Sequence, residues 1–325
     1  MKNISLHHIL TLIVLLPVIQ LSFASTDSAI GGPITTQYQT EQVSPSTYVI
    51  HGPRANPTPE NQGFINNPAF IVGETGIIVI DAGSTLQVGE MVLHHIKSIS
   101  DLPVVATFAT HIHGDHWLGN QAIIAAYPNA VHYAHPNMIE QAKEGEGQNW
   151  VDLMLSLTEG ASAGTSFIAP DTEIDEGHKL SIAGKTFAIF HDPVAHTDTD
   201  IAIQFVEERV LFLGDTAMNG RLGRLDDGNF KGLIAFLDRM LTVDTDVYVP
   251  GHGHSGTVQV VRDFRELVDA IYSTVLNEYD NGLSDFEIKP LVEKQINNKT
   301  QWIDLNESLG KFVSLAYLEV EEDAF

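Results

Sequence analysis

Four side chains that commonly bind metal ions occur within six consecutive residues, and this stretch constrains the chain more than any other feature. They are His111, His113, Asp115 and His116. An apolar segment over 103–110 predicts a strand before them, and 117–127 predicts a helix after them. Because His111 and His113 are two residues apart, they face the same side at the end of a strand. A turn that only capped a helix would need one or two of these residues, so the stretch predicts a metal-binding turn.

Three further candidate ligands follow predicted strands later in the chain. Asp215 comes directly after an apolar strand predicted over 209–213, and His252 follows the strand predicted over 246–249. His196 lies in a polar loop between two predicted strands. Side chains at such junctions can converge where solvent enters. The chain contains no cysteine, which excludes a thiolate ligand or nucleophile, and a set of imidazoles and carboxylates suits zinc as well as iron or manganese.

Predicted strands and helices alternate in two similar halves. The first half has predicted strands over 69–73, 77–81, 103–110 and 130–134 and helices over 85–98 and 117–127. The second half has predicted strands over 179–182, 186–191, 200–205, 209–213 and 246–249 and helices over 136–157, 230–241 and 258–279. Two sheet-rich halves, each covered by helices, predict an α/β (α+β) fold, a four-layer αββα sandwich.

The chain divides into four expected segments. They are a signal peptide over 1–24, an N-terminal arm over 25–66, the main domain over 67–280 and a helical C-terminal extension over 281–325. Lys2, the apolar run over 9–19 and the small residues Ser22 and Ala24 are typical of a secretory signal cleaved after Ala24. We therefore expect a periplasmic or secreted protein. An uncleaved N-terminal anchor helix is the alternative.

Charge restricts the partners. The net charge is −25, from 17 basic and 42 acidic residues, and a surface this negative repels phosphate backbones and anionic lipid headgroups. We expect a small-molecule substrate, no nucleic acid and no membrane partner after signal cleavage. The oligomeric state stays open.

The order His-x-His-x-Asp-His, then His, Gly-Asp and Gly-His, resembles the metallo-β-lactamase superfamily from about residue 69 to residue 256. The apolar strand that ends in Asp81 resembles that family as well. The chain as a whole is most similar to the SoxH-type and quinoprotein-relay zinc hydrolases. The resemblance implies one zinc ion on His111, His113 and His196, and a second zinc ion on Asp115, His116 and His252. It also implies that the Asp215 carboxylate bridges the two ions.

The activity that the resemblance implies is hydrolysis of a small ester, thioester, lactone or lactam by a hydroxide that bridges two zinc ions. Asp115 would orient that hydroxide and take up a proton, as the catalytic residue. One alternative is a β-lactamase proper, although Asp215 resembles the bridging aspartate of glyoxalase II and lactonases more closely. Another is an iron-dependent redox enzyme similar to persulfide dioxygenases. A non-catalytic binding protein is a third, which the complete ligand set disfavours.

Three residues outside the ligand set are candidates for substrate binding. Arg221 and Arg224 follow Asp215 in one short loop, and either could receive a substrate carboxylate. Pairing with the neighbouring Asp226 and Asp227 is the alternative. Trp150 is expected either at the mouth of the pocket or in the core.

Overall fold

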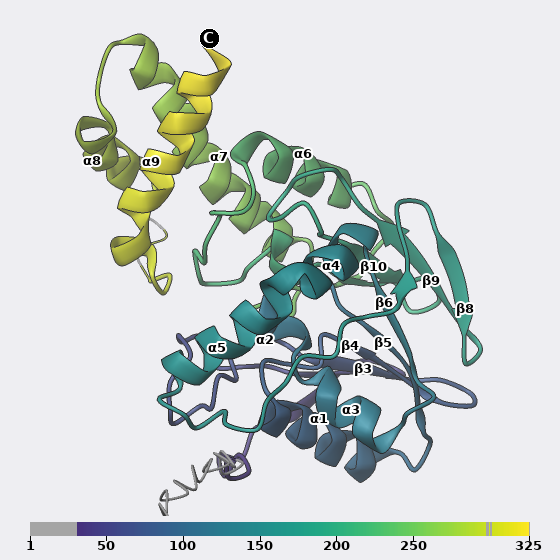
Figure 1. The fold of residues 1–325 in the computed structure, drawn as a ribbon. Helices are drawn as coiled ribbons and strands as arrows, with labels where there is room; N and C mark the ends of the chain where they lie inside the picture. The colour runs from purple at the N-terminus through teal and green to yellow at the C-terminus, as the bar shows by residue number, and fades with distance from the viewer. Residues whose placement is uncertain (1–30, 297–298, 300, 325) are drawn as a thin grey trace, which may run out of the picture.

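Two β-sheets lie face to face and helices cover their outer sides in the computed structural model (Figure 1). The structure describes residues 31–296, 299 and 301–324. The expected signal peptide over 1–24 and its cleavage site lie outside these residues. The four layers confirm the predicted αββα sandwich. Within the described part of the chain, no helix combines the length and the apolar character needed to cross a bilayer.

The first sheet has seven strands in chain order. They are β1 (Thr40–Ser44), β2 (Thr47–Ile50), β3 (Ala69–Val72), β4 (Ile77–Ile80), β5 (Val104–Phe108), β6 (Val131–Ala134) and β7 (Thr172–Glu173). Neighbours are antiparallel from β1 to β4 and parallel from β4 to β7. Strands β1 and β2 come from the segment 25–66 that we expected to be an arm, and β2 pairs with β3, so this segment is continuous with the sheet.

The second sheet has five strands in the order β12-β11-β10-β9-β8. They are β8 (Lys179–Ile182), β9 (Lys185–Phe190), β10 (Ala202–Phe205), β11 (Val210–Phe212) and β12 (Val247–Val249). The inward faces of the two sheets form one apolar core, in which Phe108 of the first sheet meets Phe187 of the second at a ring-centroid distance of 5.6 Å. Burial of these alternating apolar side chains is what holds the two sheets together.

Helices cover the outer face of each sheet. On the first sheet lie α1 (Leu86–Ile99) and α3 (Asn120–Ala126), and on the second lie α6 (Phe230–Met240) and α7 (Gln259–Asp280). The C-terminal α8 (Asp285–Gln295) and α9 (Leu305–Asp323) pack on α7 and form a helical lobe (Figure 1). Ser284 and Glu287 form a capping box at the start of α8.

Two predicted helices are interrupted. In place of the single helix predicted over 117–127, the chain forms the short α2 (Gly114–Trp117) and then α3, and at Gly119, between them, it runs against the backbone of Ala82. A Cβ at Gly119 would lie 2.3 Å from the Ala82 carbonyl oxygen. The segment predicted over 136–157 contains α4 (Pro136–Gln141), a π-turn (Ala142–Glu146) and α5 (Gly147–Leu157), with the break at Gly145, whose φ is 137°. That φ is accessible to glycine at little cost.

Candidate metal centre

Seven side chains from four separate loops meet at one end of the two sheets. The stretch His111–His116 follows β5, His196 lies between β9 and β10, and His252 follows β12. Asp215 lies in a 3₁₀-turn (Gly214–Thr216) directly after β11. All seven side chains are buried. The ends of neighbouring strands therefore bring together residues that are as much as 141 positions apart.

The seven residues form two clusters that share Asp215. His111, His113 and His196, called the first cluster below, each place one ring nitrogen within 4.8 Å of the others and of an Asp215 oxygen. The second cluster is Asp115, His116 and His252, arranged in the same way.

The two oxygens of Asp215 face different clusters. Asp215 Oδ2 lies 3.9 Å from His111 Nε2 and 3.7 Å from His196 Nε2. Asp215 Oδ1 lies 3.2 Å from the Nε2 atoms of His116 and His252. One carboxylate thus stands between two separate sets of donors.

Outer hydrogen bonds set which ring nitrogen of four histidines faces the centre. Carboxylates and carbonyls only accept, so the nitrogen that contacts them must carry the proton and the other keeps its lone pair. His116 Nδ1 donates to Asp81 Oδ2 at 2.8 Å, and His252 Nδ1 donates to the Ile65 carbonyl at 2.8 Å.

The first cluster is held in the same manner by different partners. His113 Nε2 donates to Asp227 Oδ2 at 3.0 Å, which leaves His113 Nδ1 facing His196 Nε2 at 3.1 Å. The Thr110 hydroxyl donates to Asp81, so its oxygen is free to accept from His111 Nδ1 at 3.0 Å. Each inward nitrogen is therefore available to bind a cation.

Burial and neighbouring charges move the pKa values of the clustered groups apart. Burial raises the pKa of Asp115, but the His116 and His252 imidazoles outweigh it and hold that pKa below its usual value. The pKa of Asp215 is lowered in the same way, chiefly by His252 and His116 against the effect of burial. Burial and the adjacent His113 lower the pKa of His196 to about 3. Both carboxylates therefore stay ionised and His196 stays neutral. Asp115 and Asp215 outweigh burial and raise the pKa values of His116 and His252, so a cation that binds these two imidazoles would displace a proton.

The donor set fits a pair of divalent cations. Within the described residues, His111 Nε2, His116 Nε2 and Asp215 Oδ1 are buried and make no hydrogen bond. A buried polar atom without a partner costs about 1–3 kcal/mol, so three at one point indicate that something else pairs with them. Five imidazoles and two carboxylates without sulfur are donors that zinc, iron and manganese accept.

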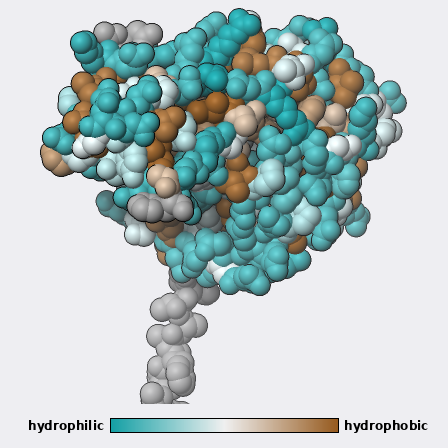
Figure 2. All heavy atoms as spheres, turned by 90° about the horizontal axis from the view of Figure 1, so that it is seen from above, coloured by the Kyte–Doolittle hydropathy of each residue, from teal (hydrophilic) through white to brown (hydrophobic). Residues whose placement is uncertain are grey.

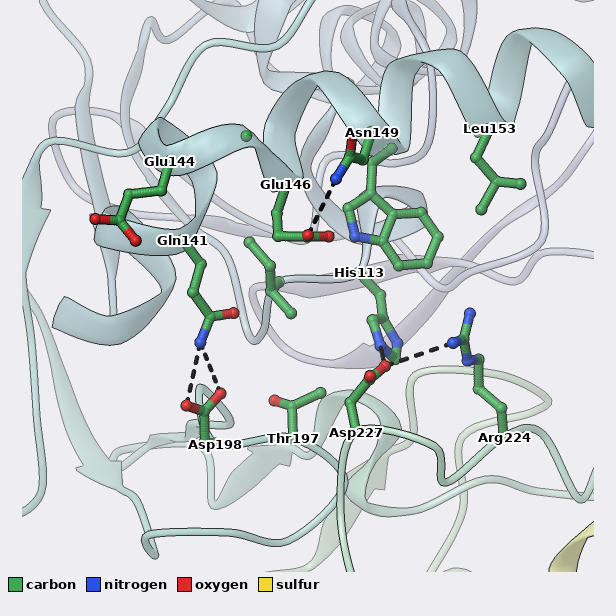
Figure 3. A pocket seen from close by; sticks show the side chains of 13 residues that line it. His113, Gln141, Glu144, Glu146, Asn149, Leu153, Thr197, Asp198, Arg224 and Asp227 are labelled. Atoms are coloured by element: carbon green, nitrogen blue, oxygen red, sulfur yellow. Dashed lines mark hydrogen bonds and ion pairs between the residues drawn. The ribbon is translucent and has the colours of Figure 1, made fainter.

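Two cavities open beside the clusters and share His113, Trp150, Leu153 and Arg224. The larger, about 750 Å³, lies between the α4–α5 segment and the loops that carry Thr197 and Asp227 (Figure 3). The smaller, about 330 Å³, reaches Asp115, Asp215 and His252 and has apolar walls that include Ile65, Met154 and Leu157. Asp304, Glu307 and Ser308, at the start of α9, also line it. The C-terminal lobe therefore contributes to the site.

The three candidate substrate residues lie at these cavities. Trp150 lines both of them, and its ring centroid is 5.0 Å from that of His113. The Arg224 guanidinium lies over the Trp150 ring and contacts Asp226 and Asp227, the pairing that we gave as the alternative. Arg221 is buried, and its guanidinium donates to Asp304 Oδ2 at 3.0 Å, to the Ala55 carbonyl and to Asn56 Oδ1. The placement leaves Arg224 better able than Arg221 to reach a substrate.

Sequence reasoning did not identify the outer partners of the histidines. Asp81 could have been found from the sequence, because it ends an apolar strand that resembles one in the metallo-β-lactamase superfamily. No sequence pattern links Asp227 to His113, since the two residues are 114 positions apart. The Ile65 carbonyl could not be found from residue type, because it is a main-chain atom.

Comparison with known proteins agrees with this geometry. Residues 62–252 match the model of the metallo-beta-lactamase superfamily. A hydroxyacylglutathione hydrolase from Francisella tularensis subsp. holarctica is 26% identical over 197 residues, which are 59% of this chain and 65% of that protein. A linear primary-alkylsulfatase from Pseudomonas sp. is 25% identical over 274 residues, 69% of this chain and 49% of that protein.

A solved structure supports the same fold. It is a sec-alkylsulfatase from Pseudomonas sp., with a TM-score of 0.65 and 17% identity, covering 87% of this chain and 50% of that one. Together with the family match over more than half of the chain, the buried His and Asp clusters at the strand ends show that this protein belongs to the metallo-β-lactamase superfamily.

Proposed function

We propose that the protein is an exported binuclear zinc hydrolase that cleaves a small ester, thioester, lactone or lactam. The observation that most directly supports this proposal is the position of Asp215, whose two oxygens face two separate clusters of buried donors. His111, His113 and His196 would hold one ion, and Asp115, His116 and His252 the other, with Asp215 between them. A second complete cluster favours two ions over the single iron of the persulfide dioxygenase alternative.

Two bound dications would polarise the bond to be cleaved and lower the pKa of a water. Side chains of this protein would supply proton transfer, substrate burial and charge recognition. The Asp115 carboxylate, ionised and at the wall of the smaller cavity, accepts the proton that the attacking water loses. Trp150 and the apolar walls bury the substrate and exclude bulk water. Arg224, held by Asp226 and the half-exposed Asp227, pairs with an anionic group of the substrate.

The names of two relatives indicate which kinds of bond should be tested as substrates. One is named for hydrolysis of hydroxyacylglutathione and another for hydrolysis of linear primary alkyl sulfates. We therefore add a linear alkyl sulfate to a panel of thioesters, lactones, carboxylic esters and β-lactams.

The deciding experiment combines metal analysis with that panel. We expect about two zinc ions per chain by mass spectrometry and turnover of one substrate class that is lost in Asp115→Ala. One iron per chain without hydrolysis of any panel member would overturn the proposal. Export is tested separately: the protein recovered from the periplasm or medium should begin at Ser25.

Arg224 is tested by comparing anionic and neutral substrates of the same reactive bond. Arg224→Ala should raise KM mainly for the anionic member of the pair, because only that member loses a charge-assisted contact. Arg221→Ala is the comparison variant, since its guanidinium is occupied by Asp304, Ala55 and Asn56. Equal effects on both substrates would remove Arg224 from the binding role.

A further inference from the structure

The outer partners of the two clusters differ in their exposure to solvent. Asp81, which accepts from His116 and Thr110, has a side chain that is 5% exposed. Asp227, which accepts from His113, has a side chain that is 50% exposed. The first cluster is therefore oriented in part by a half-exposed carboxylate that lines the larger cavity.

Asp227 also belongs to a chain of contacts that leads away from the centre. Its Oδ2 atom lies 3.0 Å from His113 Nε2 and 3.5 Å from the Arg224 guanidinium (Figure 3). Arg224 in turn contacts Asp226 Oδ2 at 3.2 Å. His113 and Asp227 are 114 positions apart, whereas Arg224 and Asp227 belong to one loop. Arg224 therefore holds the Asp227 carboxylate from within its own loop.

From this arrangement we propose that Asp227 is a positioning residue for the ion of the first cluster, acting through His113. The inference rests on the proposed metal centre. By accepting from His113 Nε2, the carboxylate keeps the proton on that nitrogen and leaves His113 Nδ1 with its lone pair towards His196. Loss of the acceptor lets the proton sit on Nδ1, and the remaining lone pair, on Nε2, then faces away from the first cluster.

The rotation of the ring depends on the same contact. His113 packs against Trp150 on one side, at a tilt of 50°, and against His196 on another. These ring contacts limit where the imidazole lies, and a hydrogen bond on the outer nitrogen, His113 Nε2, is needed to fix its angle. Asp227 supplies that bond. Asp226 lies one residue away, contacts Arg224 and Lys311, and makes no contact with His113 among the described residues.

Zinc affinity of the full chain gives the test. Titration against a chromophoric chelator should show that Asp227→Asn weakens one of the two zinc equivalents by about 10- to 100-fold and leaves the other unchanged. Asp227→Glu, which keeps a carboxylate that can only accept, should lose less affinity than Asp227→Asn, whose amide can also donate to His113 Nε2. Asp226→Asn is the matched control, because it changes the same loop and the same charge without touching His113.

A measurement that does not depend on metal binding tests whether Asp227 acts through the proton position on His113. In ¹⁵N spectra of the metal-free chain, His113 should carry its proton on Nε2 in the native protein and in Asp226→Asn, and lose that preference in Asp227→Asn. Two unchanged zinc equivalents in Asp227→Asn, or an equal loss in Asp226→Asn, would overturn the assignment of Asp227. Binding of fewer than two zinc ions by the native chain would instead count against the metal centre itself.

Discussion

The two clusters of the metal centre share Asp215 but rest on different parts of the molecule. The second cluster is supported from inside the fold, by the buried Asp81 at the end of β4 and by the Ile65 carbonyl. The first is supported in part by Asp227, on a loop at the cavity wall. A buried support is hard to displace without unfolding, whereas an exposed one is in contact with solvent and substrate. The difference predicts a rigid second cluster and an adjustable first cluster.

Asp115 gives the largest expected effect, because it belongs to the second cluster and also reaches the substrate cavity. Replacement of a catalytic acid–base group lowers kcat by about 10²- to 10⁴-fold. We expect Asp115→Asn to fall in this range under saturating zinc, in steady-state assays with the substrate class that the panel identifies. A kcat within a factor of ten of the native value would remove Asp115 from the catalytic role.

Asp81→Ala and Asp227→Ala compare the two supports directly. Asp81 accepts from the Thr110 N–H, the Thr110 hydroxyl and His116, and loss of a buried charged partner costs about 3 kcal/mol or more. Removal of the half-exposed Asp227 should cost less than about 1 kcal/mol. Urea unfolding of the metal-free chains measures both values, and equal losses would show that the supports do not differ.

Gly114 tests how closely the ligand turn packs under α5. A Cβ at position 114 would lie 2.6 Å from the Trp150 Cβ, so Gly114→Ala must displace α5. Such overpacking costs about 1–3 kcal/mol. If the cause is the contact with the Trp150 Cβ, the double variant with Trp150→Gly, which removes that atom, should regain part of the loss. Thermal unfolding of the single and double variants completes the cycle, and purely additive losses would contradict this explanation.

At neutral pH His51 gives the smallest effect, because it acts on the pH dependence of stability in acid. Its Nε2 accepts from the Ser255 N–H in the loop that carries His252, and burial together with His254 lowers the pKa of His51 to about 4. As the pH falls from about 6.5 to 4, the unfolded chain binds a proton that the folded chain does not, so stability decreases. The contribution is at most about 1.4 kcal/mol per pH unit.

His51→Asn should flatten the slope of unfolding free energy against pH between 4 and 6.5, with little change above pH 7. His94→Asn, on an exposed face of α1, serves as the control histidine. An unchanged slope in His51→Asn would show that other groups set the acid sensitivity of this side of the site.

Much of the architecture could be predicted because its signals are local. The apolar runs at 77–80 and 104–108 are strands in the structure, as the sequence predicts. The break at Gly145 and the separation of α2 from α3 could not be predicted in this way. The separation of α2 from α3 depends on a contact between residues distant in sequence, the approach of Gly119 to Ala82.

The sequence by itself determined the donor chemistry, because five histidines, two aspartates and the absence of cysteine are properties of residue type. It also placed those residues at the ends of strands, through the alternation of apolar runs and polar loops. Only the tertiary structure decided which oxygen of Asp215 faces which cluster, that Asp81 and Asp227 orient His116 and His113, and that the start of α9 lines the cavity. These contacts join residues separated by tens to more than a hundred positions, and hydrogen bonds at such separation depend on packing, which no local pattern encodes.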